Sequence, residues 1–157
     1  MNPLTFLVGQ WAVMQIYQRV EKKVVTERAY EYARSVGKPV LDFGCGDTPR
    51  GDYNLDIVQR RAPNFIKVEA FEAPSIPFPD KFFGSALCFH VLEHVDDPEN
   101  LVRELSRVAD RIFVITLRAL YWRTWFNGEH KWVFIGDTQI RNPFYSHSQD
   151  SGILYPE

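Results

Sequence analysis

Two short apolar runs in this chain each carry an aspartate at or next to their last position, and a glycine turn separates the two runs. The first run, residues 40–43, contains Asp42 and leads into Gly44 and Gly46. The second run, residues 53–56, ends in Asp56. Glycines let a backbone approach a ligand where a Cβ would clash, and a carboxylate after the second strand can accept from both hydroxyls of a ribose. The order predicts a nucleotide-type pocket at the edge of a parallel sheet.

A second group of chemically capable residues lies at His90, Glu93 and His94. An imidazole titrates near neutral pH, so His90 could take the proton from a hydroxyl or amine nucleophile. The run His-Val-Leu-Glu-His also spells the inverted zinc-protease motif, which on a helix would bring the two imidazoles to one face. We do not favour a protease, because so short a match arises easily by chance and the run follows a predicted strand.

The elements that must position these residues alternate between strands and helices. A helix is predicted over residues 4–36, with a break near Gly9 as an alternative and Gly37 as its stop. Five residues at helical spacing give it one apolar stripe: Val13, Ile16, Tyr17, Val20 and Val24. Strands are predicted at 40–43, around Asp56, and at 65–71, 83–91 and 111–117, with a helix beginning at Asp97 and Pro98. The alternation predicts an α/β fold with a doubly wound, mostly parallel sheet.

Composition narrows the class of protein. The chain has 157 residues, of which 45% are hydrophobic and 15% aromatic, so we expect one folded domain rather than a disordered chain. A formal net charge of −2 gives no general attraction to nucleic acid. Two cysteines without CxxC spacing predict reduced thiols and a cytoplasmic protein.

The N-terminal segment is uncharged up to Arg19. Polar residues interrupt it too often for a spanning helix, and no basic region precedes an apolar core as in a signal peptide. A helix that lies on a membrane surface or on a protein partner remains an alternative.

Four segments, taken in order, resemble the class I S-adenosylmethionine-dependent methyltransferases of the type 11 group. They are residues 40–46, 76–83, 91–98 and 105–108. The resemblance implies a Rossmann-like methyltransferase fold in a single domain. Within it we assign residues 1–38 to an N-terminal helical segment, residues 40–117 to a cofactor-binding core, and residues 118–157 to an aromatic cap and tail.

The resemblance also implies S-adenosylmethionine as cofactor and a small-molecule or lipid-like acceptor. Asp42 would hold the amino group of the cofactor, Asp56 the ribose hydroxyls and Glu72 the adenine amine. His90 would lie at the methyl-transfer centre and is the candidate catalytic residue. The implied cofactor-binding residues are Asp42, Gly44, Cys45, Gly46, Asp56, Ile57, Glu72, Ala73 and Phe89.

The chain departs from the family pattern in its first crossover. Thr48 and Pro49 stand where a third glycine is usual, and residues 47–55 are too few for a full helix. We therefore expect the first crossover helix to be reduced to a short turn. The missing glycine also argues against a dinucleotide oxidoreductase.

Other departures affect the function. Gly84 replaces a usual acid, Ala109 and Asp110 replace a Pro-Gly-Gly turn, and the fold is expected to be truncated at its C-terminus. An inactive cofactor- or partner-binding domain is therefore the alternative, with a homodimer covering the exposed sheet edge. Methylation of RNA or protein is less favoured, because there is no basic groove and the Asn-Pro-Pro-Tyr type of motif is absent after the fourth strand.

Glu93 and His94 also resemble the end of a Glu-x-x-Glu-His motif with which some methyltransferases hold a divalent metal. His90 stands where those proteins have the first glutamate, and His130 is the candidate for a later ligand. Most type 11 members carry Leu-Glu-His without a metal. We therefore predict no metal, with Glu93 and His94 bonded locally in a first helical turn.

Overall fold

The elements of the structure follow the predicted alternation. A computed structural model describes residues 3–69, 75–116, 125–126, 129–135 and 138–145, with side chains from residue 13 onward. In chain order the elements are α1 (Pro3–Ser35), β1 (Val40–Phe43), β2 (Tyr53–Asp56), β3 (Phe65–Lys67), β4 (Phe83–Phe89), α2 (Pro98–Val108), β5 (Ala109–Ile115), β6 (Trp132–Ile135) and β7 (Thr138–Arg141).

The first five strands form one sheet in the order β3-β2-β1-β4-β5, and every neighbouring pair is parallel. Asp42 of β1 lies beside Asn54 of β2 on one side and Leu87 of β4 on the other. The order of the strands reverses between β1 and β4, which is where ligands bind in open α/β sheets, outside the carboxyl ends of the strands. The predicted doubly wound parallel fold is confirmed.

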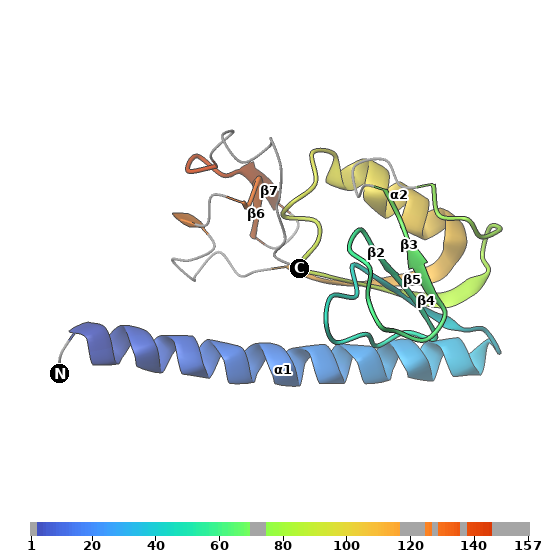
Figure 1. The fold of residues 1–157 in the computed structure, drawn as a ribbon, viewed down its shortest axis with the longest axis horizontal. Helices are drawn as coiled ribbons and strands as arrows, with labels where there is room; N and C mark the ends of the chain where they lie inside the picture. The colour runs from blue at the N-terminus through green and yellow to red at the C-terminus, as the bar shows by residue number, and fades with distance from the viewer. Residues whose placement is uncertain (1–2, 70–74, 117–124, 127–128, 136–137, 146–157) are drawn as a thin grey trace.

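The two helices cover opposite faces of this sheet (Figure 1). On one face α1 contributes Ala29 and Ala33 to a cluster with Val40, Leu87 and Phe89. On the other face α2 packs its buried side chains against the larger cluster; they are Leu101, Leu105 and Val108. Asp97 caps α2 by accepting from the backbone N–H of Asn100 at 3.0 Å, as predicted.

Gly84 has a packing reason. A Cβ at this position would lie 2.7 Å from the Cα of Ala33, so only glycine lets α1 approach β4 this closely. The acid that the family usually carries here would be incompatible with that helix.

The connection between β1 and β2 contains no helix in its residues 44–52, all of which the structure describes. The backbone N–H groups of Gly44 and Cys45 both donate to the carbonyl of Leu55, at 2.8 and 3.1 Å. Gly51 then passes so close to β1 that a Cβ would lie 2.6 Å from the backbone nitrogen of Asp42. The expected reduction of the first crossover is confirmed.

Helix α1 confirms the predicted N-terminal helix, without the break at Gly9 that was the alternative. Its N-terminal part extends beyond the sheet (Figure 1). The predicted apolar stripe is exposed: Val13 is 66% exposed and Ile16 65%. The predicted stop is confirmed, because Gly37 adopts a φ of 65° and the N–H of Lys38 donates to the carbonyl of Ala33. Among the described residues, α1 included, no helix has the length and apolar character needed to span a bilayer.

Three strand predictions need correction. β3 ends at Lys67 rather than Phe71, and β4 ends at Phe89 because His90 turns out of the sheet with a φ of 58°. β5 begins at Ala109, two positions before the predicted start, since α2 passes into it without a loop. The antiparallel pair β6–β7 was not predicted at all, because its aromatic residues show no clean alternation.

Candidate functional site

Asp42 lies at the switch point with its side chain almost wholly buried, 1% exposed. Its Oδ2 accepts from the backbone N–H of Arg50 at 2.8 Å. Burial raises the pKa of Asp42 to about 6, while the hydrogen bond and charge of Arg50 and the charge of Lys22 act in the opposite direction. A buried carboxylate with spare acceptor capacity is suited to a cationic ligand group.

Asp56 stands at the end of β2, on the same face of the sheet as Asp42, and the glycine turn lies between them. Its Oδ2 accepts from the N–H of Gly46 at 2.8 Å, and its Oδ1 accepts from the N–H of Val58 at 3.0 Å. A carboxylate offers about four acceptor positions, so about two are left beside the Nε of Arg60, which lies 3.8 Å from Oδ2 as an ion pair. This is the number that the two hydroxyls of a ribose require.

The glycine turn leaves room for a ligand. Gly44 and Gly46 adopt φ values of 71° and 56°, in the left-handed region that favours glycine. A Cβ at Gly46 would find no atom within 4 Å, so space lies beside the turn. Cys45 is buried in the turn, and burial together with Asp42 and Asp56 raises the pKa of its thiol to about 12, so it remains a thiol.

Two basic residues whose charges act on Asp42 were not predicted as part of the site, because neither lies in a recognisable motif. Lys22 projects from α1, and its pKa is lowered by burial and by the charge of Arg50, while Glu93 and Asp42 act to raise it. Arg50 lies in the β1–β2 connection, which the hydroxyl of Tyr30 ties to α1 by donating to the Arg50 carbonyl at 2.9 Å. The guanidinium of Arg50 is 5.9 Å from the ring centroid of Phe89. Phe89 itself is buried against α1.

His90 follows the last residue of β4, at the position where the resemblance places methyl transfer. Its φ of 58° is unusual for a residue with a side chain, and its N–H donates to the carbonyl of Ile115 at 2.7 Å. The ring Nδ1 lies 3.3 Å from Oε1 of Glu93, and the buried Nε2 has no hydrogen-bond partner. Strained backbone of this kind is concentrated at functional sites.

Glu93, His94 and His130 meet next to His90. One potential ligand atom from each lies within 4.8 Å of the others. The imidazole rings of His94 and His130 are 4.9 Å apart, and the pKa of His94 is lowered, chiefly by burial. Glu93 and His94 were expected to make only local contacts. They also lie against His130, which belongs to a distant segment of the chain.

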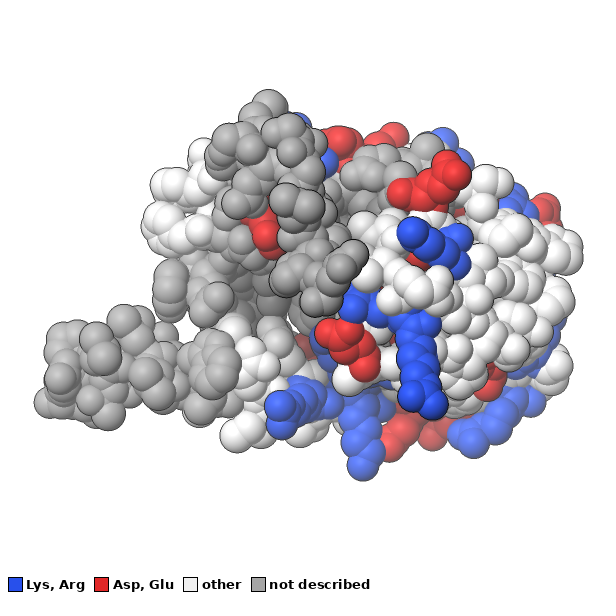
Figure 2. Space-filling model, viewed as in Figure 1, with Lys and Arg blue, Asp and Glu red and all other residues white. Residues whose placement is uncertain are grey.

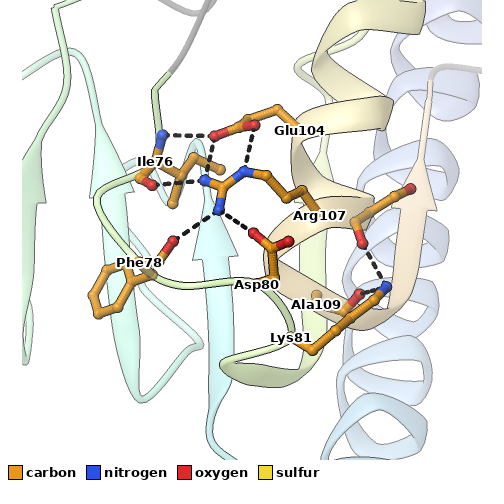
Figure 3. Close-up of polar contacts among 8 residues, drawn as sticks. Ile76, Phe78, Asp80, Lys81, Glu104, Arg107 and Ala109 are labelled. Atoms are coloured by element: carbon orange, nitrogen blue, oxygen red, sulfur yellow. Dashed lines mark hydrogen bonds and ion pairs between the residues drawn. The ribbon is translucent and has the colours of Figure 1, made fainter.

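The predicted adenine-side residues Glu72 and Ala73 lie outside the described residues. The loop that follows them is held by Arg107 of α2, which donates to the carbonyls of Ile76 and Phe78 at 3.0 and 2.9 Å (Figure 3). Arg107 also pairs with two carboxylates that raise its pKa, those of Glu104 and Asp80. Ile57, the remaining predicted residue, is half-buried beside the main hydrophobic cluster.

The sheet order and the positions of Asp42 and Asp56 together define a Rossmann-like α/β domain with acidic groups at its switch point. Over residues 14–148 the chain matches the model of a methyltransferase domain family, and it therefore belongs to that family. This confirms the resemblance to the class I methyltransferases. No curated protein and no solved structure matched the chain.

Proposed function

We propose that this protein transfers a methyl group from S-adenosylmethionine to a small-molecule or lipid-like acceptor. The observation that supports this most directly is the position of Asp42 and Asp56. Asp42 is the next-to-last residue of β1 and Asp56 the last residue of β2, both on the same face of the sheet, and the N–H of Gly46 donates to Asp56 at 2.8 Å. Membership of a methyltransferase domain family supports the same chemistry.

In this proposal the pocket binds the cofactor through opposite charges at its methionine end. Asp56 accepts from the ribose hydroxyls with its free acceptor positions. Asp42 pairs with the ammonium group, while Lys22 and the Arg50 guanidinium attract the carboxylate. The residues predicted for the adenine, Glu72 and Ala73, remain part of the proposal on the resemblance alone.

His90 is the proposed general base. Bound S-adenosylmethionine supplies a methyl group already activated by the sulfonium, so positioning the acceptor in line accounts for much of the rate. His90 would take the proton that a hydroxyl acceptor loses as it is methylated, and the sulfur of the cofactor would keep the electron pair of the broken C–S bond. The buried Nε2 without a hydrogen-bond partner is the nitrogen available to receive it.

The same proposal includes a cytoplasmic location and an acceptor other than nucleic acid. Cys45 and Cys88 are both buried free thiols, as suits a reducing compartment. Lys, Arg and acidic side chains are interspersed over the described part of the face in Figure 2, rather than gathered into one basic groove there.

A binding domain without catalysis is the second candidate, and the exposed stripe of α1 favours it. Val13, Ile16 and Val20 are each more than half exposed on one side of the helix. Such a stripe could take a protein partner, a second copy of the chain or a membrane surface.

Calorimetric titration with S-adenosylhomocysteine tests cofactor binding. We expect micromolar affinity for the wild-type chain and at least a tenfold loss for Asp56→Asn, which can no longer accept as a carboxylate. Asp110→Asn is the matched control, because Asp110 pairs with Lys38 at the start of β5, at the opposite end of the sheet. Absence of binding by the folded wild-type chain, or equal binding by Asp56→Asn, would refute the proposed pocket.

Methyl transfer itself needs a second measurement. Release of S-adenosylhomocysteine is followed with a panel of phenolic, hydroxylated and lipid-like acceptors. Turnover that His90→Gln reduces without changing cofactor affinity would support the enzyme. Cofactor binding without turnover on any acceptor in the panel would favour the binding domain.

A further inference from the structure

The group Glu93, His94 and His130 joins two parts of the chain that are far apart in the sequence. Glu93 and His94 lie in the turn after β4, and His130 lies just before β6. Glu93 is 1% exposed and His130 3%, while His94 is half-buried. Two imidazoles and a carboxylate enclosed together form a donor set that many metal sites use.

The backbone holds these two segments firmly against each other. The N–H groups of Lys131 and Trp132 donate to the carbonyl of Glu93 at 2.7 and 3.2 Å. The indole N–H of Trp132 donates to the carbonyl of Val95 at 2.8 Å. These hydrogen bonds, together with the contact between the His94 and His130 rings, hold the three side chains close together.

Hydrogen bonds around the group orient it as they orient metal ligands. His94 Nδ1 lies 3.1 Å from the backbone carbonyl of Glu129. A carbonyl can only accept, so Nδ1 carries the proton and the lone pair is on Nε2. A histidine that donates from one nitrogen to a carbonyl and presents the other is the usual arrangement of a metal ligand.

Glu93 provides an independent sign of a missing partner. Its Oε1 lies 3.3 Å from Nδ1 of His90, but its Oε2 is buried without a hydrogen-bond partner. Leaving a buried carboxylate oxygen unsatisfied is unfavourable, and a cation would satisfy it. The same contact makes His90 an outer partner that orients Glu93.

We propose that Glu93, His94 and His130 bind a divalent first-row transition cation such as Zn²⁺, Mn²⁺ or Co²⁺. Two imidazole nitrogens disfavour Mg²⁺ and Ca²⁺, which prefer oxygen ligands. Three ligand atoms about 2.1 Å from one ion lie at most about 3.6 Å from one another, so side-chain atoms within 4.8 Å must close by up to about 1.2 Å. The ion connects the segment before β6 to the end of β4, beside His90, and leaves a coordination position for solvent or acceptor.

The test uses the full chain, with any affinity tag removed and metals stripped by a chelator. Co²⁺ is titrated while its visible absorption is followed, and Zn²⁺ is titrated by calorimetry. We expect one equivalent to bind with micromolar or tighter affinity. Glu93→Gln, His94→Ala and His130→Ala should each weaken binding at least tenfold, whereas Glu93→Asp should retain a weaker site. Glu99→Gln, an exposed residue of α2, is the matched control.

Each outcome decides the proposal separately from cofactor binding. No binding by the wild-type chain, or equal binding by the three ligand variants, would overturn it even if S-adenosylhomocysteine still binds. If a ligand variant does not fold, as judged by circular dichroism, the absorption spectrum of Co²⁺ bound to the wild-type chain decides instead. Absorption typical of four- or five-coordinate Co²⁺ with nitrogen ligands supports the site, and a spectrum of hexaaquo Co²⁺ refutes it.

Discussion

The buried carboxylate of Asp42 leads to a prediction that couples pH to both stability and cofactor binding. The pKa of Asp42 is raised from 3.8 to about 6, mainly by burial. The folded state therefore holds this proton more tightly than the unfolded chain does. Between these two pH values the folded chain carries the proton and the unfolded chain has lost it, so this residue makes the fold less stable as pH rises through that range.

The magnitude follows from the size of the shift. A displacement of about two pH units at about 1.4 kcal/mol each gives a change of about 3 kcal/mol in the free energy of unfolding. Asp42→Asn cannot ionise, and its amide oxygen can still accept from the N–H of Arg50. Relative to wild type, the variant should therefore gain about 3 kcal/mol between pH 4 and pH 7.5.

Urea unfolding of both proteins at several pH values measures this difference. Other carboxylates titrate in both proteins and cancel in the comparison, including Glu104, whose pKa Arg107 lowers. Asp110→Asn serves as the control, since no such pH-dependent gain is expected there. A difference between Asp42→Asn and wild type that stays constant from pH 4 to pH 7.5 would refute the assignment of a raised pKa.

The same residue links pH to the proposed ligand. An ammonium group placed beside Asp42 binds the ionised carboxylate, so affinity for S-adenosylhomocysteine should fall towards tenfold per unit as pH drops below about 6. Adenosine lacks the ammonium group, and its affinity should not show this dependence on Asp42. Equal pH profiles for the two ligands would place the amino group elsewhere.

Three further predictions follow from single contacts. Lys22→Gln should weaken S-adenosylhomocysteine binding by about tenfold but leave adenosine binding unchanged, with exposed Lys23→Gln as control, because Lys22 is expected to act on the carboxylate. Arg107→Ala should lower the free energy of unfolding by about 2 kcal/mol in urea, since charged hydrogen bonds to the 76–80 loop are lost. Gly84→Ala should cost about 1–3 kcal/mol through its clash with Ala33, and wild-type stability in that variant would contradict the close helix contact.

The sequence predicted the sheet well because its signals are local. Apolar runs, the aspartate cap of α2 and the stop at Gly37 each depend on a few adjacent residues. The order Asp42, glycine turn, Asp56 predicted for the same reason that both carboxylates lie near the carboxyl ends of neighbouring strands. The β6–β7 pair was missed because its residues show no clean alternation, and the backbone bonds that join its start to Glu93 come from a distant segment.

The sequence also did not predict which residues distant along the chain act on Asp42. Lys22 sits among charged residues of a long helix, where a charge normally indicates a solvated face. Only the packing of Ala29 and Ala33 on the sheet turns that side of α1 towards Asp42. The apolar residues of the predicted stripe are exposed, since the small alanines, not the valines, make the contact with the sheet.

The reduced first crossover and the long N-terminal helix belong together. In a nucleotide-binding fold the helix after β1 usually offers its N-terminus to the negative end of the ligand. Here residues 44–52 form no helix, so that positive pole is missing. Helix α1 covers the same side as Asp42, brings Lys22 towards it, and fixes the connection through the Tyr30 hydroxyl at the Arg50 carbonyl. If the proposed cofactor binds here, these side-chain cations take the place of that helix dipole beside its zwitterionic methionine group.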